Sequence, residues 1–172
     1  MANREALREL QARLADRLAQ VRTEVRVVSW LAVECGDQGL LFPLAGAGEI
    51  FSVEMLMPVP HTQPWFAGVA NLRGGLHGVV DIAVFLGLEE QIRRRDHHLL
   101  VSLNASLGIH SAVLVDKLAG LRSADQLLAE PAEQGLLPEF AGKRWKDSQG
   151  RQWQEIDLAA LSRHEQFLAI AQ

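Results

Sequence analysis

The chain has 172 residues, a formal net charge of −4, 48% hydrophobic residues and 22% charged residues, values that exclude a largely disordered protein. The acidic balance argues against a nucleic-acid-binding protein, which usually carries a basic surplus. A single cysteine, Cys35, excludes an internal disulfide, and no apolar run is long enough to span a bilayer, so we expect a cytoplasmic chain without membrane insertion.

Residues 1–26 are predicted to form an amphipathic helix. Positions 3–22 contain no glycine or proline and consist mostly of strong helix formers. Five apolar residues recur at intervals of three or four and share one face: Leu7, Leu10, Leu14, Leu18 and Val21. Two interpretations stay open: the helix docks on its own domain, or it binds a partner or a second copy.

From Ser29 onward, short apolar runs separated by turn residues predict a mainly β fold. Strands are expected at 30–34 and 40–43, around a turn that contains two glycines. The clearest hairpin places arms at 68–72 and 76–82 around the turn Arg73-Gly74-Gly75. The charged stretch 89–96 follows and is the expected link between two halves.

The same order of elements then returns. Strands are expected at 98–103 and 109–115, and a final hairpin at 140–156 is polar enough to predict an exposed sheet edge. Asp81 and Asp157 stand at matching places and can each cap a short helix that closes its half. This order predicts a duplicated small β-barrel.

Motifs for chemistry are missing from the sequence. The six histidines show no metal-ligand spacing, and Cys35 has no obvious base beside it. We therefore predict no catalytic residue, no metal site and no cofactor. Trp65 follows a proline and is either an exposed anchor or a plug that closes a barrel, and we favour the plug.

Two charged residues lie among apolar neighbours. Glu49 precedes the apolar pair Ile50-Phe51, and Arg73 lies at the tip of the apolar hairpin. A guanidinium offers several donors in a fixed fork and can hold a carboxylate and nearby carbonyls together. Arg73 is either tied to a glutamate within the chain or is a recognition group for a partner, and both can hold.

Residues 64–87, which read PWFAGVANLRGGLHGVVDIAVFLG, closely resemble the signature of CheW-like domains. Residues 40–51 resemble the strand that precedes this signature in the family, and residues 112–121 resemble a strand that follows it. The resemblance covers about residues 29–162. The matching positions are Pro43, Leu44, Glu49, Ile50, Gly68, Val69, Asn71, Arg73, Gly74, Val79, Val80, Asp81, Ile82, Leu86, Gly87, Val113, Val115, Asp116, Leu118 and Leu121.

This resemblance implies a CheW-like domain over residues 27–172 with two five-stranded SH3-like barrels. The first would span about 29–88 and the second about 97–162, and an exchange of strands between the halves is left open. It also implies a non-catalytic adaptor between the cytoplasmic helices of methyl-accepting chemoreceptors and the regulatory domain of a CheA-type histidine kinase. The residues implied to bind partners are Glu49, Gly68, Asn71, Arg73 and Gly74.

Within the family, Trp65, Ala70 and the run Phe85-Leu86-Gly87 look most like the paralogue that serves type IV pilus twitching motility, the PilI type. That paralogue would be recruited to membrane receptor arrays at the cell pole. The alternatives are a flagellar chemotaxis adaptor, a module of a larger kinase, or a small-ligand or enzymatic domain that uses the cleft between the barrels. Departures from the family pattern are Ala47, Gly48, Gly78 and the polar final hairpin.

Overall fold

The computed structural model describes residues 29–91, 99–131 and 137–172. The helix predicted for residues 1–26 lies outside these described residues, as does most of the charged link between the halves. The described part is mainly β and contains two sheets, which confirms the predicted fold class.

The larger sheet has six strands in the order β8-β1-β2-β11-β10-β9, one more than the five expected for each barrel. Its strands are β1 (Ser29–Cys35), β2 (Gln38–Pro43), β8 (Lys117–Ser123), β9 (Leu127–Ala129), β10 (Ala141–Asp147) and β11 (Gln152–Ile156).

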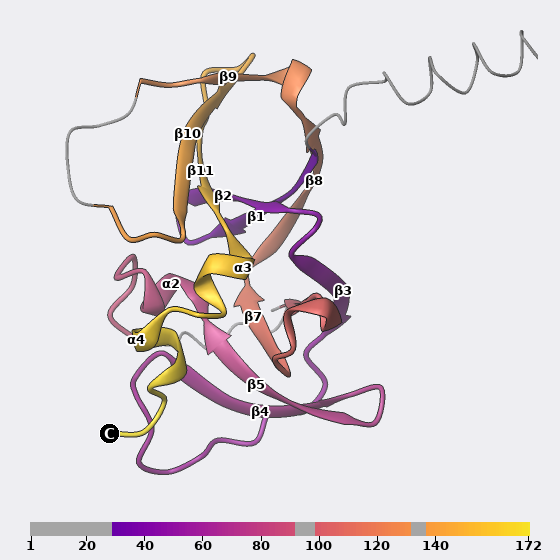
Figure 1. Cartoon of the computed structure of the whole chain (residues 1–172), viewed down its shortest axis with the longest axis vertical. Helices are drawn as coiled ribbons and strands as arrows, with labels where there is room; N and C mark the ends of the chain where they lie inside the picture. Colours follow the sequence, from indigo (N-terminus) through magenta and orange to yellow (C-terminus); the bar gives the residue numbers. More distant parts are fainter. Residues whose placement is uncertain (1–28, 92–98, 132–136) are drawn as a thin grey trace, which may run out of the picture.

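The smaller sheet has five strands in the order β3-β6-β7-β5-β4. Its strands are β3 (Ala47–Ser52), β4 (Phe66–Leu72), β5 (Gly75–Asp81), β6 (Leu99–Leu103) and β7 (Ser111–Val115). The hairpin predicted around Arg73 is the β4–β5 pair, which lies at one edge of this sheet (Figure 1).

Each sheet contains strands from both halves of the chain. In the larger sheet, β1 pairs with β8 and β2 runs parallel to β11. In the smaller sheet, β3 pairs with β6 and β5 runs parallel to β7. Neither sheet therefore belongs to one half alone.

Two short helices follow β5 and β11, and an aspartate caps each of them as predicted. Asp81 Oδ1 accepts hydrogen bonds from the backbone N–H groups of Ala83 and Val84 at 3.0 and 3.1 Å and caps α2 (Ile82–Phe85). Asp157 Oδ1 caps α3 (Leu158–Leu161) in the same way. The remaining short helices are η1 (Ala105–Leu107), η2 (Ala124–Gln126) and α4 (Glu165–Leu168).

The indole of Trp65 lies in the core and is only 6% exposed, so the interpretation as an exposed anchor is wrong, and the side chain is buried as the interpretation as a plug requires. Its ring meets Phe85 edge-on at a centroid distance of 5.2 Å and lies parallel to Phe167 of α4 at 6.5 Å. The chain end is held against the loop before Trp65, because Gln63 N–H donates to the Ile170 carbonyl at 2.8 Å. No pattern in the sequence indicates this contact.

The final hairpin is not a sheet edge, which corrects the prediction for residues 140–156. β11 lies between β2 and β10, and β9 forms the edge instead. Trp153 is 2% exposed, and the guanidinium of Arg151 lies over its ring at 4.6 Å from the centroid. Polar side chains of this hairpin thus cover a buried tryptophan and do not mark a free edge.

Candidate functional site

The β4–β5 turn holds two successive residues with positive φ. Leu72 pairs with Gly75, so Arg73 and Gly74 form a two-residue loop with φ of 49° and 82°. Positive φ at both positions is the pattern of a type I′ turn, whose twist matches that of the flanking strands. Asn71 Oδ1 accepts a hydrogen bond from Gly74 N–H at 2.8 Å and fixes the loop.

Arg73 is an unusual residue for this turn. Among the described residues, only Arg73 and His61 combine a side chain with a positive φ. A left-handed conformation costs an ordinary L-residue about 1–2 kcal/mol, and asparagine or glycine would adopt it more readily. Local stability therefore does not explain an arginine here, and such strain often accompanies function.

The guanidinium of Arg73 reaches across to β3. Its Nη2 lies 2.7 Å from Glu49 Oε2, and the two side chains are 76% and 54% exposed. The Glu49 backbone is fixed in turn, because its N–H donates to Ser102 Oγ at 2.8 Å and its carbonyl accepts from that hydroxyl at 3.2 Å. The tie within the chain is confirmed, while recognition of a partner stays a prediction.

Beside this ion pair lies a hollow of about 390 Å³, which we call the Arg73 surface. Its walls come from β3, from the β4–β5 turn and from the segment around η1, and they mix apolar and polar groups. His77 and His110 face each other there with ring centroids 5.3 Å apart. Its lining residues include Glu49, Phe51, Leu72, Arg73, His77 and Ser102.

Gly68 lies apart from this surface. It is buried, its φ is 132°, and a Cβ placed on it would overlap the carbonyl oxygen of Met57. The segment around Met57 pairs with Val69 through two backbone hydrogen bonds of 2.8 and 2.9 Å. Among the residues expected to bind partners, Asn71 and Gly74 are exposed beside Arg73, whereas Gly68 lets another chain segment approach β4.

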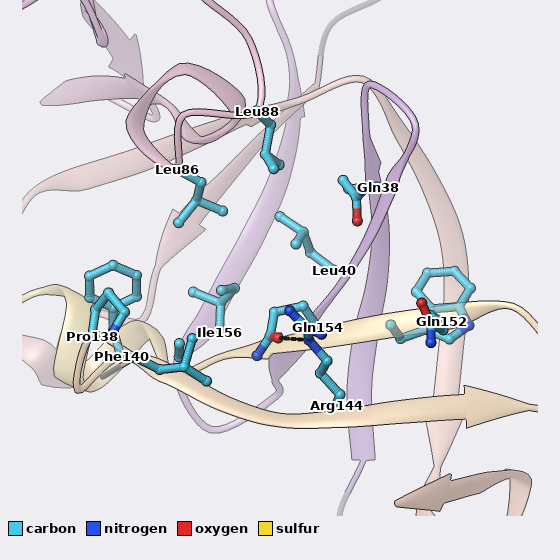
Figure 2. A pocket seen from close by; sticks show the side chains of 13 residues that line it. Gln38, Leu40, Leu86, Leu88, Pro138, Phe140, Arg144, Gln152, Gln154 and Ile156 are labelled. Carbon is cyan, nitrogen blue, oxygen red and sulfur yellow. Dashed lines mark hydrogen bonds between the residues drawn. The ribbon is translucent and has the colours of Figure 1, made fainter. Parts of the chain in front are cut away.

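A second concavity of about 430 Å³ lies between β2, β10 and β11 and the segment that follows α2, and we call it the α2 groove. Figure 2 shows its apolar side chains facing one another across the opening, with amide side chains and Arg144 at one side. Arg144 Nε donates to Gln154 Oε1 at 3.2 Å. Its main apolar lining residues are Leu40, Leu86, Leu88, Leu137, Phe140 and Ile156. In the sequence, only the apolar stretch Leu86-Gly87-Leu88 could have indicated the α2 groove.

Burial or hydrogen bonds within the fold hold two side chains with reactive groups, the Cys35 thiol and the Asp147 carboxylate. Cys35 is 1% exposed, and burial raises the pKa of its thiol far above the ordinary range, with the nearby Asp116 charge adding to the effect. The Asp147 carboxylate accepts hydrogen bonds from the Trp153 indole at 3.0 Å and from the backbone N–H groups of Arg151 and Gln149, which lowers its pKa. Within the described ranges, no three histidine, cysteine or acidic side chains are grouped to hold a metal ion.

No helix in the part of the chain that the structure describes is long and apolar enough to cross a membrane.

Comparison with known proteins extends these observations. A family model described as the CheW-like domain matches residues 29–166. The chain is 27% identical over 165 residues to Protein PilI of Pseudomonas aeruginosa, a match that covers 92% of this chain and 89% of that protein. The crystal structure of the scaffolding protein TtCheW from Thermoanaerobacter tengcongensis superposes with a TM-score of 0.63 at 14% identity, covering 76% of this chain and 88% of that one. At this identity, the last match shows a shared fold.

Proposed function

Because this chain belongs to the family of CheW-like domains, we propose that it is a non-catalytic adaptor that couples chemoreceptors to a CheA-type histidine kinase. Similarity to Protein PilI along 92% of the chain supports a place in the chemosensory pathway that controls type IV pilus twitching motility. The adaptor would then work at membrane receptor arrays at the cell pole.

The observation that carries this proposal is the exposed, oriented Arg73 guanidinium on a strained turn. Its ion pair with Glu49 is solvent-exposed and is worth only about 0.5 kcal/mol, less than the conformational cost of the turn. What the pair does supply is orientation, since one carboxylate oxygen holds one arm of the fork. Because 76% of the Arg73 side chain is exposed, we expect its other donors to be accessible to a partner's carboxylate or carbonyl groups.

The chemistry of the described side chains supports an adaptor and not a catalyst. Catalysis by a thiol needs an accessible thiolate, and Cys35 is a buried thiol with a raised pKa. Glu49 and Arg73 form an ion pair on an open surface, whereas general acid–base catalysis uses a titratable group in a pocket that excludes water. This surface is suited to recognition.

Binding measurements test the proposal. We expect the purified chain to bind both the regulatory domain of its cognate CheA-type kinase and a cytoplasmic receptor fragment. Arg73→Glu should weaken receptor binding by about tenfold or more, which is about 1.4 kcal/mol, while kinase binding is retained. A complete lack of association with the kinase at high micromolar concentration would overturn the adaptor role.

The swap of both charges separates the two readings of Arg73. If the ion pair matters only by shaping the surface, the double variant Glu49→Arg with Arg73→Glu should recover part of the receptor binding. If each side chain contacts the receptor, the double variant should stay as weak as the single ones. Lys117→Glu is the matched control, because Lys117 is an exposed cation 3.9 Å from Glu34 in the other sheet. Wild-type receptor binding by Arg73→Glu would remove Arg73 from the site.

A further inference from the structure

The α2 groove has apolar walls that remain open to solvent. Leu88 is 41% exposed and Leu137 is 49% exposed, although both line the groove with the buried side chains of Leu40, Phe140 and Ile156. Figure 2 shows Leu86 and Leu88 on one side and Leu40 and Ile156 across the opening. A trough of this kind suits the apolar stripe of an amphipathic helix, because side chains spaced by one turn can enter it in a row.

Acidic residues outnumber basic ones beside the groove. Asp37, Glu89, Glu139, Glu155 and Asp157 directly adjoin lining residues in the sequence, against the basic residues Lys143 and Arg151, and Asp37 and Glu139 are exposed. Arg144 is the one charged side chain among the lining residues of the described part, and it is already hydrogen-bonded to Gln154. An occupant with an apolar stripe between basic side chains would match both the floor and the rim.

The chain itself contains such a segment. Residues 1–28 carry six arginines against four acidic residues, whereas the rest of the chain carries an acidic excess. Their predicted helix gathers Leu7, Leu10, Leu14, Leu18 and Val21 on one face. An isolated helix of this length is marginal in water, so its stability depends on packing that face against something.

The connection is long enough for the segment to reach the groove. β1 starts at Ser29, and the antiparallel register places Val33 opposite Leu40 of the groove floor. Four residues of strand correspond to about 13 Å. Residues 22–28 can span up to about 24 Å when extended.

We propose that residues 3–21 dock as an amphipathic helix in the α2 groove, with the leucine face on the apolar floor and the arginines toward the acidic rim. This assignment is independent of the adaptor role. In this arrangement the chain's own segment occupies the groove, so any partner helix that binds the same groove must first displace it. The apparent affinity of such a partner would equal its intrinsic affinity multiplied by the fraction of molecules in which the groove is open.

Cross-linking of the full chain tests the docking. A bifunctional thiol reagent with a short spacer is applied to a variant carrying Leu14→Cys and Leu88→Cys. The native Cys35 does not compete, because it is 1% exposed and its thiol has a raised pKa. Leu88 is partly exposed, so its substitution leaves the core intact. We expect an intramolecular product at low micromolar protein.

The control combines Leu14→Cys with Leu121→Cys. Leu121 is 61% exposed on β8 and pairs with Leu31, so it lies nearer the start of β1 than the groove does. A segment without a docking site would link to Leu121 at least as fast as to Leu88. Docking predicts linking to Leu88 faster by about fivefold or more, because the effective concentration of the two thiols is higher there.

Three results would overturn the proposal. The first is equal or faster linking to Leu121. The second is a product of twice the chain mass with Leu88, which would assign the groove to the segment of a second copy. The third is an unchanged rate of linking to Leu88 after Arg13→Glu and Arg17→Glu. These charge reversals should slow the linking if the acidic rim holds the helix. Faster linking to Leu88 that these charge reversals reduce would support intramolecular docking.

Discussion

Replacing Arg73 with asparagine should separate the folding role of this residue from its recognition role. Arg73→Asn removes the ion pair with Glu49, in which Nη2 and Oε2 are 2.7 Å apart on exposed side chains, at a loss of about 0.5 kcal/mol. The same change relieves the backbone, because φ is 49° and asparagine adopts this left-handed region more readily than arginine, a gain of about 0.5–1 kcal/mol. The two effects nearly cancel.

The free energy of unfolding should therefore stay within about 0.5 kcal/mol of the wild type, which is a change in Tm of about 2 °C or less for a chain of this size. Urea unfolding and calorimetry measure this quantity. Binding of the receptor fragment should fall by about tenfold or more, since the oriented guanidinium is gone. Lys117→Asn is the matched control, because Lys117 is 71% exposed and its ion pair with Glu34 is long, at 3.9 Å. It should change neither quantity.

Two outcomes would refute this reasoning. A loss of more than about 2 kcal/mol in Arg73→Asn would mean that the ion pair is a structural tie of larger value than exposed pairs usually have. Receptor binding equal to the wild type in a folded Arg73→Asn variant would mean that the guanidinium recognises nothing, and the strained turn would then need another explanation.

Gly68→Ala should lower the free energy of unfolding by more than about 3 kcal/mol, because φ is 132° and the new Cβ would overlap the Met57 carbonyl. Gly74→Ala should lower it by only about 1 kcal/mol, because φ is 82° but the space around Gly74 is open. Equal losses in urea unfolding would contradict this. The Cys35 thiol, buried and with a raised pKa, should react with a thiol reagent only after unfolding, and rapid reaction of the folded chain would show that it is accessible. Hydrogen bonds lower the pKa of Asp147, so they stabilise the fold above the ordinary carboxyl pKa, and this contribution is lost as pH falls through the lowered value. Asp147→Asn should thus lower Tm at pH 7 and have little effect near pH 2, whereas the same shift at both pH values would count against it.

Local features were the ones that the sequence predicted well. The turn at the tip of the β4–β5 hairpin and the caps at Asp81 and Asp157 depend on a few neighbouring residues, and the structure has all three. The turn was predicted one residue too long, because Gly75 pairs with Leu72 and belongs to β5. The tie of Arg73 to Glu49 was also foreseen as one of two readings, because a guanidinium among apolar neighbours needs an acceptor.

Features that join distant segments could not be predicted in this way. Nothing in Trp153 or its polar neighbours indicates that β2 will lie beside β11, so the final hairpin was wrongly expected at a sheet edge. The contact of Gln63 with the backbone of Ile170 also joins segments far apart in the sequence. The α2 groove arises from the same kind of long-range assembly, since its walls come from four separate segments.

The interleaved strands also bear on how the chain acquires its structure during synthesis. β1 and β2 leave the ribosome before the other strands that the structure describes, but Glu34 of β1 pairs with Lys117 and Gly39 of β2 pairs with Trp153. The β1–β2 hairpin therefore lacks its neighbouring strands until nearly the whole chain has been translated. Until then Trp30, Leu41 and Phe42, which are buried in the folded chain, are exposed to solvent. Pairing over such separations slows folding, because the loop-closure entropy is lost before the contacts form. We therefore expect the nascent chain to depend on chaperones until its last strand, β11, emerges.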